Sequence, residues 1–317
     1  MAGKPNPSPY DAPELYDLLF DSLDFDVPYW VETARAAGGP VLELACGSGR
    51  LLIPIRKAGV EVDGLDSSPA MIRRLKERAA TDGLAVRAEV ADMRDFSMGR
   101  RYARIFCGFN GFAHCETIDD QVAVLRRSLE HLEPGGALVL HMSYPGPAYW
   151  AEPDGAAVLE HEAPRPGGGK LQLWDNRKKN IVAQRQDSEV EIWELGASDR
   201  PQAVHKFSTS QRWVYRFELE LLFRAAGDEM ELAAHLPQKG FRRLELIELL
   251  IAQDAGADKI ARRFDVIDIF ADPIQRLQIA QAPLAFLEIG LDRIARAAEA
   301  LVAKAPLGEL GIDEFGR

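Results

Sequence analysis

The sequence predicts an α/β fold with a doubly wound parallel sheet. Between residues 41 and 142, short apolar segments alternate with longer amphipathic ones, as strands alternate with helices in such folds. The first strand-to-helix connection carries the glycines of segment 47–49, and residues 133–136, EPGG, separate the last helix from the last strand. Alternation at this spacing favours a parallel sheet covered by helices on both faces.

The elements of this core follow one another in a regular order. The segment Ser67-Ser68-Pro69 has the polar residues and the early proline of a helix start. The expected strands cover residues 41–45, 60–65, 86–90, 104–106 and 137–142, and the main expected helices cover 12–24, 51–58, 67–80 and 119–132.

The character of the chain changes after Pro145. Residues 163–169, APRPGGG, have the composition of a loop, and the residues after them alternate as in strands. The clearest example is 188–195, where Val190 and Ile192 stand between glutamates. We therefore expect residues 170–217 to form a small antiparallel sheet inserted into the main fold.

The last hundred residues have a less regular pattern. Residues 241–250 and 264–270 have the composition of the last two strands of the main sheet, and 232–236 and 252–262 that of helices. Residues 280–301 carry apolar side chains at alternating spacings of four and three, which is a heptad pattern. This segment either packs on its own subunit or forms the contact of a homodimer.

These observations divide the chain into five parts. They are an N-terminal tail and helical lid at 1–36, the core at 37–145, an antiparallel cap insertion at 146–217, the end of the core sheet with extra helical sequence at 218–271, and a helical C-terminal extension at 272–317.

Composition limits the function classes. The chain has 317 residues, of which 47% are hydrophobic and 27% charged, as in globular proteins. Its net charge of −11 argues against a nucleic-acid partner. Neither a membrane-spanning run nor a secretory signal is recognisable, and Cys46, Cys107 and Cys115 suit neither a disulfide framework nor a zinc site. We expect a reduced, cytoplasmic protein with no membrane partner and no metal.

The most informative segment is VLELACGSGR at residues 41–50. Gly47 and Gly49 allow a ligand to approach the backbone closely, and the following helix offers unpaired N–H groups. A nicotinamide dinucleotide site would need a third glycine where Leu52 stands. The pattern is instead Glu43 followed by the two glycines, which is compatible with another ligand or with a tight structural turn that binds none.

Carboxylates close the next two strands. Asp66 closes the second strand, where it can accept both hydroxyls of a ribose, cap the next helix, or do both. Asp92 closes the third strand, where it can accept an amino hydrogen of adenine. Met71 and Met93 either pack on the faces of that ring or belong to the core.

Five segments of the core have an order and spacing typical of one family. They are ELACGSG at 43–49, VDGLDSSPAMI at 62–72, EVADMRDF at 89–96, GFNGFAH at 108–114 and LEPGGALVL at 132–140. Over residues 10–145 the chain thereby resembles the class I S-adenosylmethionine-dependent methyltransferases, whose fold is Rossmann-like. It is most similar to the small-molecule branch that contains sugar-amine and glycine-type N-methyltransferases.

The resemblance implies that S-adenosylmethionine is the cofactor and that residues 37–145 bind it. The backbone of Ala45, Gly47 and Gly49 would flank its methionine part, and Arg50 would pair with its carboxylate. A Tyr on an N-terminal helix covers the cofactor in this branch, and Tyr16 matches it.

The resemblance also assigns the nucleotide part of the cofactor. Asp66 would take the ribose hydroxyls and Asp92 the adenine amine. Outside the nucleotide, the backbone near Phe109 and Asn110 would receive the cofactor's amino group. The full set of predicted cofactor residues is Tyr16, Glu43, Ala45, Gly47, Gly49, Arg50, Asp66, Ser67, Met71, Asp92, Met93, Phe109 and Asn110.

Methyl transfer requires an aligned nucleophile and, for an amine or a phenol, a place for its proton. The predicted catalytic residues are His114, Tyr16 and Tyr144, with ordinary packing or hydrogen bonding as the alternative role of each. The predicted substrate residues are His114, Trp150, Trp193 and Arg212. Together with the acidic charge, the resemblance indicates a small-molecule acceptor that is methylated at N or O.

Two other functions are compatible with the sequence. The sulfonium of S-adenosylmethionine also supports aminobutyrate transfer or cyclisation, which would give a product without an added methyl group. A non-catalytic cofactor- or partner-binding protein would bind the cofactor without turnover.

Overall fold

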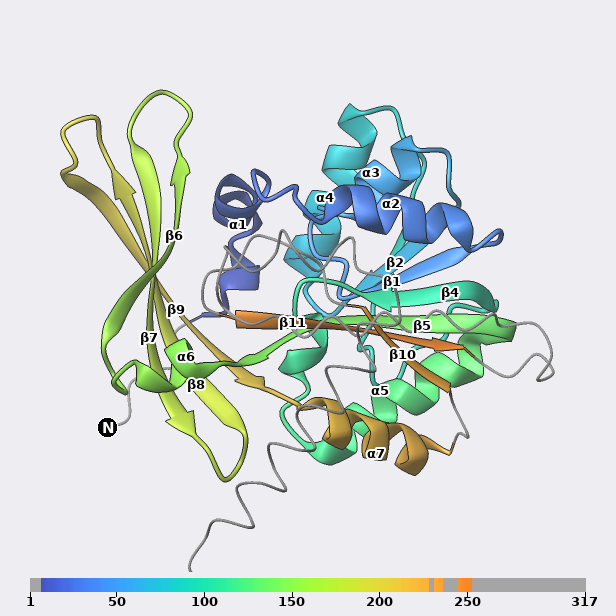
Figure 1. The fold of residues 1–317 in the computed structure, drawn as a ribbon. Helices are drawn as coiled ribbons and strands as arrows, with labels where there is room; N and C mark the ends of the chain where they lie inside the picture. Colours follow the sequence, from blue (N-terminus) through green and yellow to red (C-terminus); the bar gives the residue numbers. More distant parts are fainter. Residues whose placement is uncertain (1–6, 228–230, 236–243, 253–317) are drawn as a thin grey trace, which may run out of the picture. The chain divides into compact units, whose positions relative to one another are not determined.

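The structure is a computed structural model that describes residues 7–227, 231–235 and 244–252. Contacts divide the chain between Phe264 and Asp265, and every described residue belongs to the first unit. This unit contains a seven-stranded sheet in the order β10-β11-β5-β4-β1-β2-β3 and a four-stranded sheet in the order β6-β7-β8-β9 (Figure 1). We call the first the core sheet and the second the cap sheet.

Five strands of the core sheet run in parallel, as the sequence predicts. They are β1 (Val41–Leu44), β2 (Val62–Asp66), β3 (Arg87–Val90), β4 (Tyr102–Cys107) and β5 (Leu132–Pro145). All four residues of β1 are buried, because the central strand of a parallel sheet is covered on both faces. The predicted doubly wound parallel sheet is therefore confirmed.

Helices cover both faces of the core sheet (Figure 1). On one side lie α2 (Val27–Ala36), α3 (Leu52–Lys57) and α4 (Pro69–Thr81), and on the other lie α5 (Ile118–His131) and α7 (Arg216–Ala226). Each side buries its own apolar cluster against the strands. Among the residues that the structure describes, no helix is long and apolar enough to cross a bilayer.

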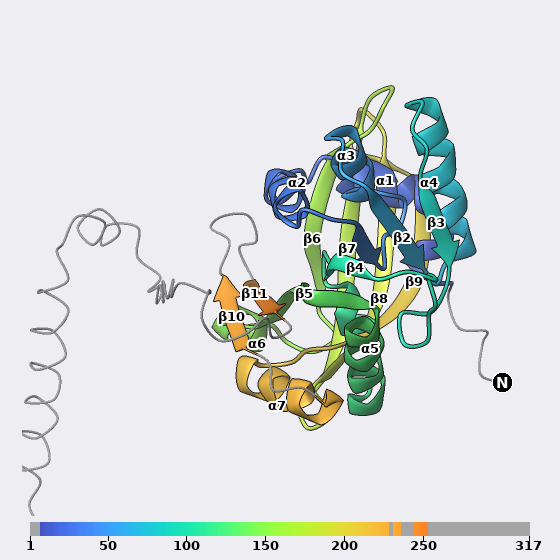
Figure 2. The ribbon, with the colours of Figure 1, turned by 90° about the vertical axis from the view of Figure 1, so that its right-hand side faces the viewer.

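Two further strands extend the edge of the core sheet beside β5 (Figure 2). β11 (Leu244–Ala252) pairs antiparallel with β5, and β10 (Glu231–His235) pairs antiparallel with β11. The strand predicted at 241–250 is confirmed with shifted bounds. The helix predicted at 232–236 is wrong, because so short an apolar segment carries no periodicity that separates helix from strand.

Three other predictions for the C-terminal part fall outside the described residues. They are the helix that would follow β11 up to residue 262, the strand at 264–270 and the heptad segment at 280–301.

The cap sheet is the antiparallel insertion that the sequence predicts. It contains β6 (Ala157–Pro164), β7 (Lys170–Asn180), β8 (Arg185–Leu195) and β9 (Pro201–Arg212), each paired with the next. The short helix α6 (Pro147–Ala151) connects it to β5. The sheet begins earlier than predicted, because β6 precedes the glycine-rich loop.

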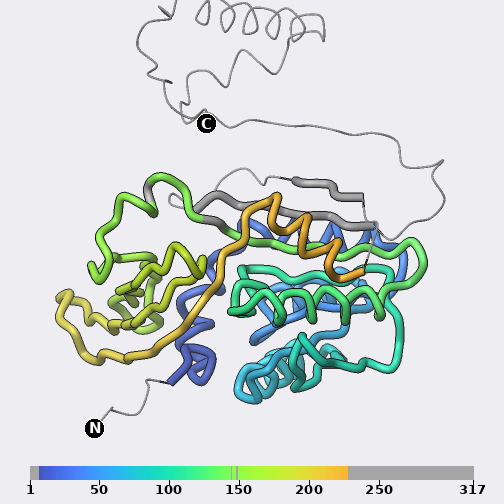
Figure 3. The backbone as a smooth tube through the Cα atoms, turned by 90° about the horizontal axis from the view of Figure 1, so that it is seen from below, coloured from blue at the N-terminus to red at the C-terminus, as the bar shows by residue number. Residues whose placement is uncertain are grey.

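The helix α1 (Pro13–Phe20) lies between the two sheets (Figure 3). Leu19 is fully buried in an apolar cluster with residues of the cap sheet. Ahead of α1, backbone carbonyls in and just before η1 (Pro9–Asp11) bind to the cap sheet and to the start of α4. The carbonyl of Pro7 accepts from Ser208 N of β9 at 3.0 Å, and the carbonyl of Tyr10 accepts from Ser68 Oγ at 3.0 Å. The N-terminal segment therefore contacts both the cap sheet and the core.

A buried histidine on β5 fixes the turn that follows β4. His141 Nδ1 accepts a hydrogen bond from Phe109 N at 3.0 Å, and the His141 carbonyl accepts one from Asn110 N at 3.2 Å. The Nδ1 acceptor role requires the neutral ring with its proton on Nε2. Burial lowers the pKa of His141 to about 4.

This shift predicts a pH dependence of stability. An unfolded histidine has a pKa of about 6.5, so the unfolded state binds more protons between about pH 4 and 6.5. The contribution is complete above that window and is lost as the pH falls through it, by on the order of 3 kcal/mol. We expect His141→Gln to flatten the dependence of the unfolding free energy on pH, measured by urea titration. An unchanged slope in His141→Gln would contradict the assignment.

Candidate functional site

Two neighbouring cavities lie at the carboxyl ends of the core strands. The inner cavity, about 450 Å³, is lined by residues at and after the ends of β1, β2, β3 and β4, by Ser8, Tyr10 and Tyr16 of the N-terminal segment, and by residues 208–210 of β9. The cap cavity, about 600 Å³, lies between α1, the core and the cap sheet. Tyr10, Tyr16, Phe109 and Thr209 line both cavities, so the cavities meet at these four residues, which we call the junction.

Strained backbone surrounds the inner cavity. Ala45, Phe109 and Asn110 have φ angles of 52°, 49° and 63°, in the left-handed region that residues other than glycine rarely adopt. Each such residue costs on the order of 1–3 kcal/mol and persists only where its surroundings hold it. Here the hydrogen bonds from β5 hold two of the three. Strain of this kind gathers at ligand sites.

Two glycines let the backbone itself form the wall of the inner cavity. Gly47 has a φ of 54°, which glycine adopts without a steric penalty. Gly111 begins η2 (Gly111–His114), and a Cβ atom there would lie 2.7 Å from Cys107 Sγ and 2.9 Å from Ala45 Cβ. A side chain at Gly111 would therefore push the turn after β4 away from the end of β1.

Asp66 presents its carboxylate to the inner cavity from the end of β2. Its Oδ2 accepts from Gly47 N at 2.9 Å, and its Oδ1 accepts from Ser68 N at 2.8 Å. Burial raises its pKa, and the two backbone N–H groups act against that rise. A carboxylate oxygen has two acceptor positions, so each oxygen of Asp66 can accept a further hydrogen bond.

Two predicted residues lie outside the lining of the inner cavity, close to the end of β1. Glu43 is buried, its Oε2 has no hydrogen-bond partner within the described part of the chain, and burial raises its pKa well above the usual value. Arg50 pairs with Asp26 through contacts of 2.6 and 2.8 Å, and its guanidinium lies 4.5 Å from the centre of the Phe109 ring. Arg50 thus holds the start of α2 close to the junction.

The inner cavity brings together most of the predicted cofactor set. Asp92 is an exception, because its side chain is 42% exposed and pairs with Arg94 at 2.6 Å. The predicted cofactor residues that line the inner cavity are Tyr16, Ala45, Gly47, Asp66, Ser67, Met71, Met93 and Phe109, and the predicted catalytic residue His114 lines it too. Those that do not line it are Glu43, Gly49, Arg50, Asp92 and Asn110.

His114 forms a pair with Tyr10 that the sequence did not predict. Its Nδ1 lies 3.2 Å from the carbonyl of Ser210, and its Nε2 lies 2.7 Å from Tyr10 Oη. A carbonyl only accepts, so in the neutral ring Nδ1 carries the proton and Nε2 accepts the phenolic hydrogen of Tyr10. Burial lowers the pKa of His114 and raises that of Tyr10, which keeps both neutral. The only sequence signal for Tyr10 was its place before the lid helix.

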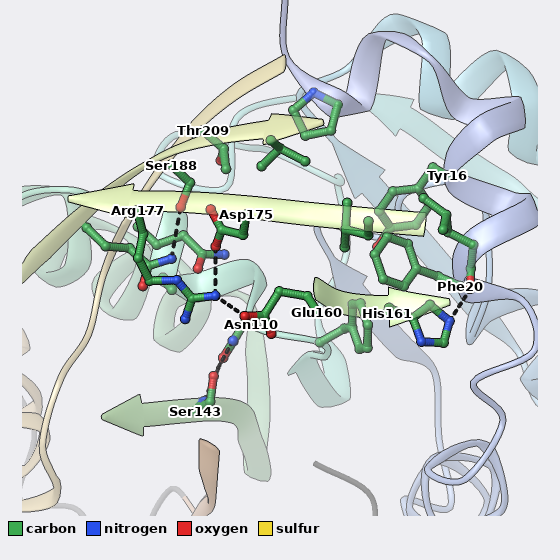
Figure 4. A pocket seen from close by; sticks show the side chains of 18 of the residues that line it. Tyr16, Phe20, Asn110, Ser143, Glu160, His161, Asp175, Arg177, Ser188 and Thr209 are labelled. Atoms are coloured by element: carbon green, nitrogen blue, oxygen red, sulfur yellow. Dashed lines mark hydrogen bonds and ion pairs between the residues drawn. The ribbon is translucent and has the colours of Figure 1, made fainter. Parts of the chain in front are cut away.

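The wall of the cap cavity on the cap sheet consists of alternate residues of neighbouring strands (Figure 4). Alternate side chains of a strand point to opposite faces, so one face of the sheet lines the cavity. The residues on this face are Leu173, Asp175 and Arg177 of β7, Gln186, Ser188, Val190 and Ile192 of β8, and Thr209 and Gln211 of β9. The alternation was recognisable in the sequence, but it did not indicate which face is the inner one.

Three of the four predicted substrate residues are not brought to either cavity. Trp193 and Arg212 alternate with the residues that line the cap cavity, so they belong to the opposite face of their strands. Trp150 is 36% exposed on α6. Arg212 is instead buried, where it donates hydrogen bonds to Gln121 of α5 and to Gln184 in the turn between β7 and β8. Tyr144 belongs to β5, but its side chain lies outside the described part of the structure.

The strand order, the strained turns and the carboxylate after β2 define a class of protein. The chain is a class I S-adenosylmethionine-dependent methyltransferase, and residues 41–136 match the family model described as a methyltransferase domain. Its cofactor is S-adenosylmethionine.

The chain is similar to individual methyltransferases of known name. The chain is 26% identical over 231 residues to the cypemycin N-terminal methyltransferase of a Streptomyces species. The aligned residues cover 71% of this chain and 89% of that protein. It is 27% identical over 228 residues to the dTDP-3-amino-3,6-dideoxy-alpha-D-glucopyranose N,N-dimethyltransferase of Streptomyces fradiae, with coverages of 69% and 84%. The solved structure of the CcbJ methyltransferase from Streptomyces caelestis superposes with a TM-score of 0.59 at 25% identity, over 73% of this chain and 90% of that one.

Proposed function

We propose that this methyltransferase acts on an amine nitrogen of a small molecule that binds in the cap cavity. The observation that carries the proposal is the junction, where Tyr10, Tyr16, Phe109 and Thr209 line both cavities. A cofactor in the inner cavity and an acceptor in the cap cavity would meet there. Bringing two reactants together in line is the main contribution that a protein makes to this kind of displacement.

The residues of the inner cavity fit S-adenosylmethionine. When bound, the cofactor supplies a methyl group on a sulfonium, which a nucleophile can displace directly. Asp66 has acceptor positions left for two hydroxyl donors, and the backbone at Ala45 and Gly47 offers a wall without bulky side chains. Met71 and Met93 line the same cavity and offer apolar contact to a flat ring. Asp92 and Arg50 would bind the cofactor only by leaving their present partners.

The chemistry of the junction favours an amine over an alcohol. A neutral amine has a nucleophilic lone pair and can lose its proton after the methyl group has been transferred, whereas an alcohol needs a base during the attack. None of the four junction residues carries a carboxylate or an imidazole. Close by, His114 has both ring nitrogens in hydrogen bonds. The names of the two relatives above, which specify an N-terminus and an N,N-dimethylated amino sugar, support the same acceptor atom.

Tyr10 is placed to orient the acceptor amine. Its phenolic hydrogen is donated to His114, so its oxygen keeps acceptor positions that face the junction. An amine N–H donated to this oxygen would direct the nitrogen lone pair away from Tyr10. On the side of α1, Tyr16 of the junction packs against Phe20 with ring centres 4.6 Å apart, which gives the junction an aromatic border.

Acceptor assays test the proposal. We expect an amine to gain the mass of one or two methyl groups when it is incubated with S-adenosylmethionine, while the alcohol of the same carbon skeleton does not react. Products are followed by mass spectrometry over a panel of matched pairs. Methylation of the alcohols alone would contradict the choice of nitrogen. A product without added methyl, or binding without turnover on any acceptor, would contradict methyl transfer to an amine.

The variant Tyr10→Phe tests the orienting role. It removes one neutral hydrogen-bond acceptor, so kcat with the identified amine should fall roughly two- to tenfold. The dissociation constant of S-adenosylmethionine, measured by calorimetry, should change little. Tyr215→Phe, at a residue 37% exposed at the start of α7, is the matched control and should keep kcat. An unchanged kcat in Tyr10→Phe would remove Tyr10 from the mechanism.

The variant Asp66→Asn tests the cofactor assignment. Loss of a charge-assisted acceptor should weaken cofactor binding roughly ten- to a hundredfold. Burial raises the pKa of Asp66, and only the ionised form accepts at every position, so native affinity should be full above this pKa and fall as the pH drops through it. The variant should lack that step. Asp95→Asn, with a side chain 82% exposed, should bind like the native protein, and equal affinity in Asp66→Asn would refute the assignment.

A further inference from the structure

The wall that the cap sheet gives to the cap cavity changes from polar to apolar along the strands. Cross-strand partners of β7, β8 and β9 form rows across the sheet, and successive rows on one face lie two residues apart, roughly 7 Å along a strand. The residues of four successive rows that line the cavity are Gln186 and Gln211; Arg177, Ser188 and Thr209; Asp175 and Val190; and Leu173 and Ile192. The first two rows are polar, the third is mixed and the fourth is apolar. In Figure 4, Ser188 and Arg177 accordingly lie at one side of the cavity, and Phe20 and His161 at the other.

The helix α1 packs over the fourth row. Leu19 of this helix is fully buried in one apolar cluster with Ile192, and Phe20 and Leu173 pack against the same cluster. All four of these side chains line the cap cavity, and we call them the apolar end. On β6, the ring of His161 borders it by stacking on Phe20, with ring centres 6.0 Å apart. The apolar end is thus enclosed by the helix on one side and by the cap sheet on the other.

The apolar end adjoins the junction directly. The ring centre of Phe20 lies 4.6 Å from that of Tyr16 and 5.5 Å from that of Phe109, and both of these residues belong to the junction. The polar rows also adjoin the junction, because Thr209 belongs to it. A substituent on a nitrogen at the junction could therefore extend either over the polar rows or into the apolar end.

Several polar groups of the cap wall already have partners within the protein. Gln186 Oε1 accepts from Tyr149 Oη at 2.7 Å, and Gln186 Nε2 donates to Ser188 Oγ at 3.2 Å. Arg177 pairs with Asp175 Oδ2 at 3.0 Å. A ligand hydroxyl in this region would exchange such hydrogen bonds for others, and an exchange of equivalent hydrogen bonds gives little net free energy.

The apolar end offers a ligand a different kind of contact. Its four side chains carry no hydrogen-bonding group, so a polar substituent placed there would lose its bonds to water without replacement. An apolar substituent gains free energy in proportion to the area that it removes from water. The balance of these two effects favours an apolar group in this part of the cavity.

We infer that the acceptor amine carries an apolar substituent, a phenyl or branched alkyl group, that binds in the apolar end between α1 and the fourth row of the cap sheet. The inference deepens the proposed function and rests on it for the position of the nitrogen at the junction. It assigns substrate choice to Ile192 and Leu173 of the cap sheet and to Leu19 and Phe20 of α1.

Binding measurements test the inference separately from turnover. The protein with S-adenosylhomocysteine is titrated in a calorimeter with alkylamines of increasing length, with phenylalkylamines and with ω-amino alcohols of the same chain lengths. Each added methylene should tighten binding roughly fourfold until the apolar end is filled. At the best length, the alkylamine should bind roughly tenfold or more tightly than the amino alcohol, whose hydroxyl would lose its water.

Two variants of the apolar end locate the substituent. Ile192→Asn places an amide there and should weaken binding of the phenylalkylamine roughly ten- to a hundredfold, while the amino alcohol changes little. Leu173→Phe fills part of the space and should shift the best length to a shorter substituent. Val204→Asn, 41% exposed and outside the lining of the cap cavity, is the matched control on β9 and should bind like the native protein. Circular dichroism checks that each variant folds, and the length series in Leu173→Phe decides if Ile192→Asn does not.

The outcomes are distinguishable. Affinity that does not depend on the length of the substituent would overturn the inference. Tighter binding of the amino alcohols would overturn it too, because the substituent would then lie over the polar rows. The same holds for a length series that Leu173→Phe leaves unchanged. Methyl transfer is assayed in parallel with the same compounds. Methylation of amines without a preference for apolar substituents leaves the proposed function intact, whereas selective binding of apolar amines that are not methylated contradicts the proposed function and not the apolar end.

Discussion

The buried carboxylate of Asp17 connects α1 to the turns of the core sheet and to α4. It accepts from Ser48 Oγ at 2.5 Å, from Arg74 Nε at 2.7 Å and from Arg78 Nη1 at 2.9 Å, and the residue is only 5% exposed. Removing one of these partners would leave the buried carboxylate less well compensated. Because Tyr16 precedes Asp17 on the same helix, the position of the junction depends on this contact.

The helix α1 is also fixed from the side of the cap sheet. Its carbonyl at Leu19 accepts a hydrogen bond from His161 Nε2 of β6 at 2.8 Å, which satisfies one of the carbonyl groups that a helix leaves open at its end. The Phe20 ring stacks on the His161 ring and contacts the Phe109 ring edge-on. One short helix thus transmits the position of the core to the cap, and both cavities share it as a wall.

The sequence predicted the parts of the molecule whose conformation depends on residues close together in the chain. The core strands, the helix start at Ser68 and the glycine turn after β1 depend on short-range periodicity and on backbone conformations that few residues allow. Most of the cofactor cavity follows, because these turns meet at one edge of the sheet. The site residues beyond the backbone were harder to predict. Asp92 has the expected place after β3, but Arg94, two residues later, engages it at the surface.

The cap residues were mispredicted for a different reason. An alternating strand that is partly polar on both faces does not reveal which face is the inner one, and a shift by one residue exchanges the faces. Trp193 looked suited to a binding site but faces away from the cavity, whereas Ile192 and Val190 line it. Asp175 and Arg177 were overlooked because charged residues on a strand usually face water. Their burial follows from the packing of the cap sheet against α1, which the sequence of one strand does not show.

The separation of the two sheets has a consequence for how such an enzyme can diversify. The inner cavity is formed mainly by turns of the core sheet and the N-terminal segment, with residues 208–210 of β9, while the cap sheet contributes a row of alternate side chains to the cap cavity. Exchanges in β7 and β8, whose residues do not line the inner cavity, alter the shape and charge of the cap cavity without disturbing the strained turns of the core. Natural selection or a designed library can therefore vary substrate choice on one sheet while the chemistry is inherited unchanged from the other.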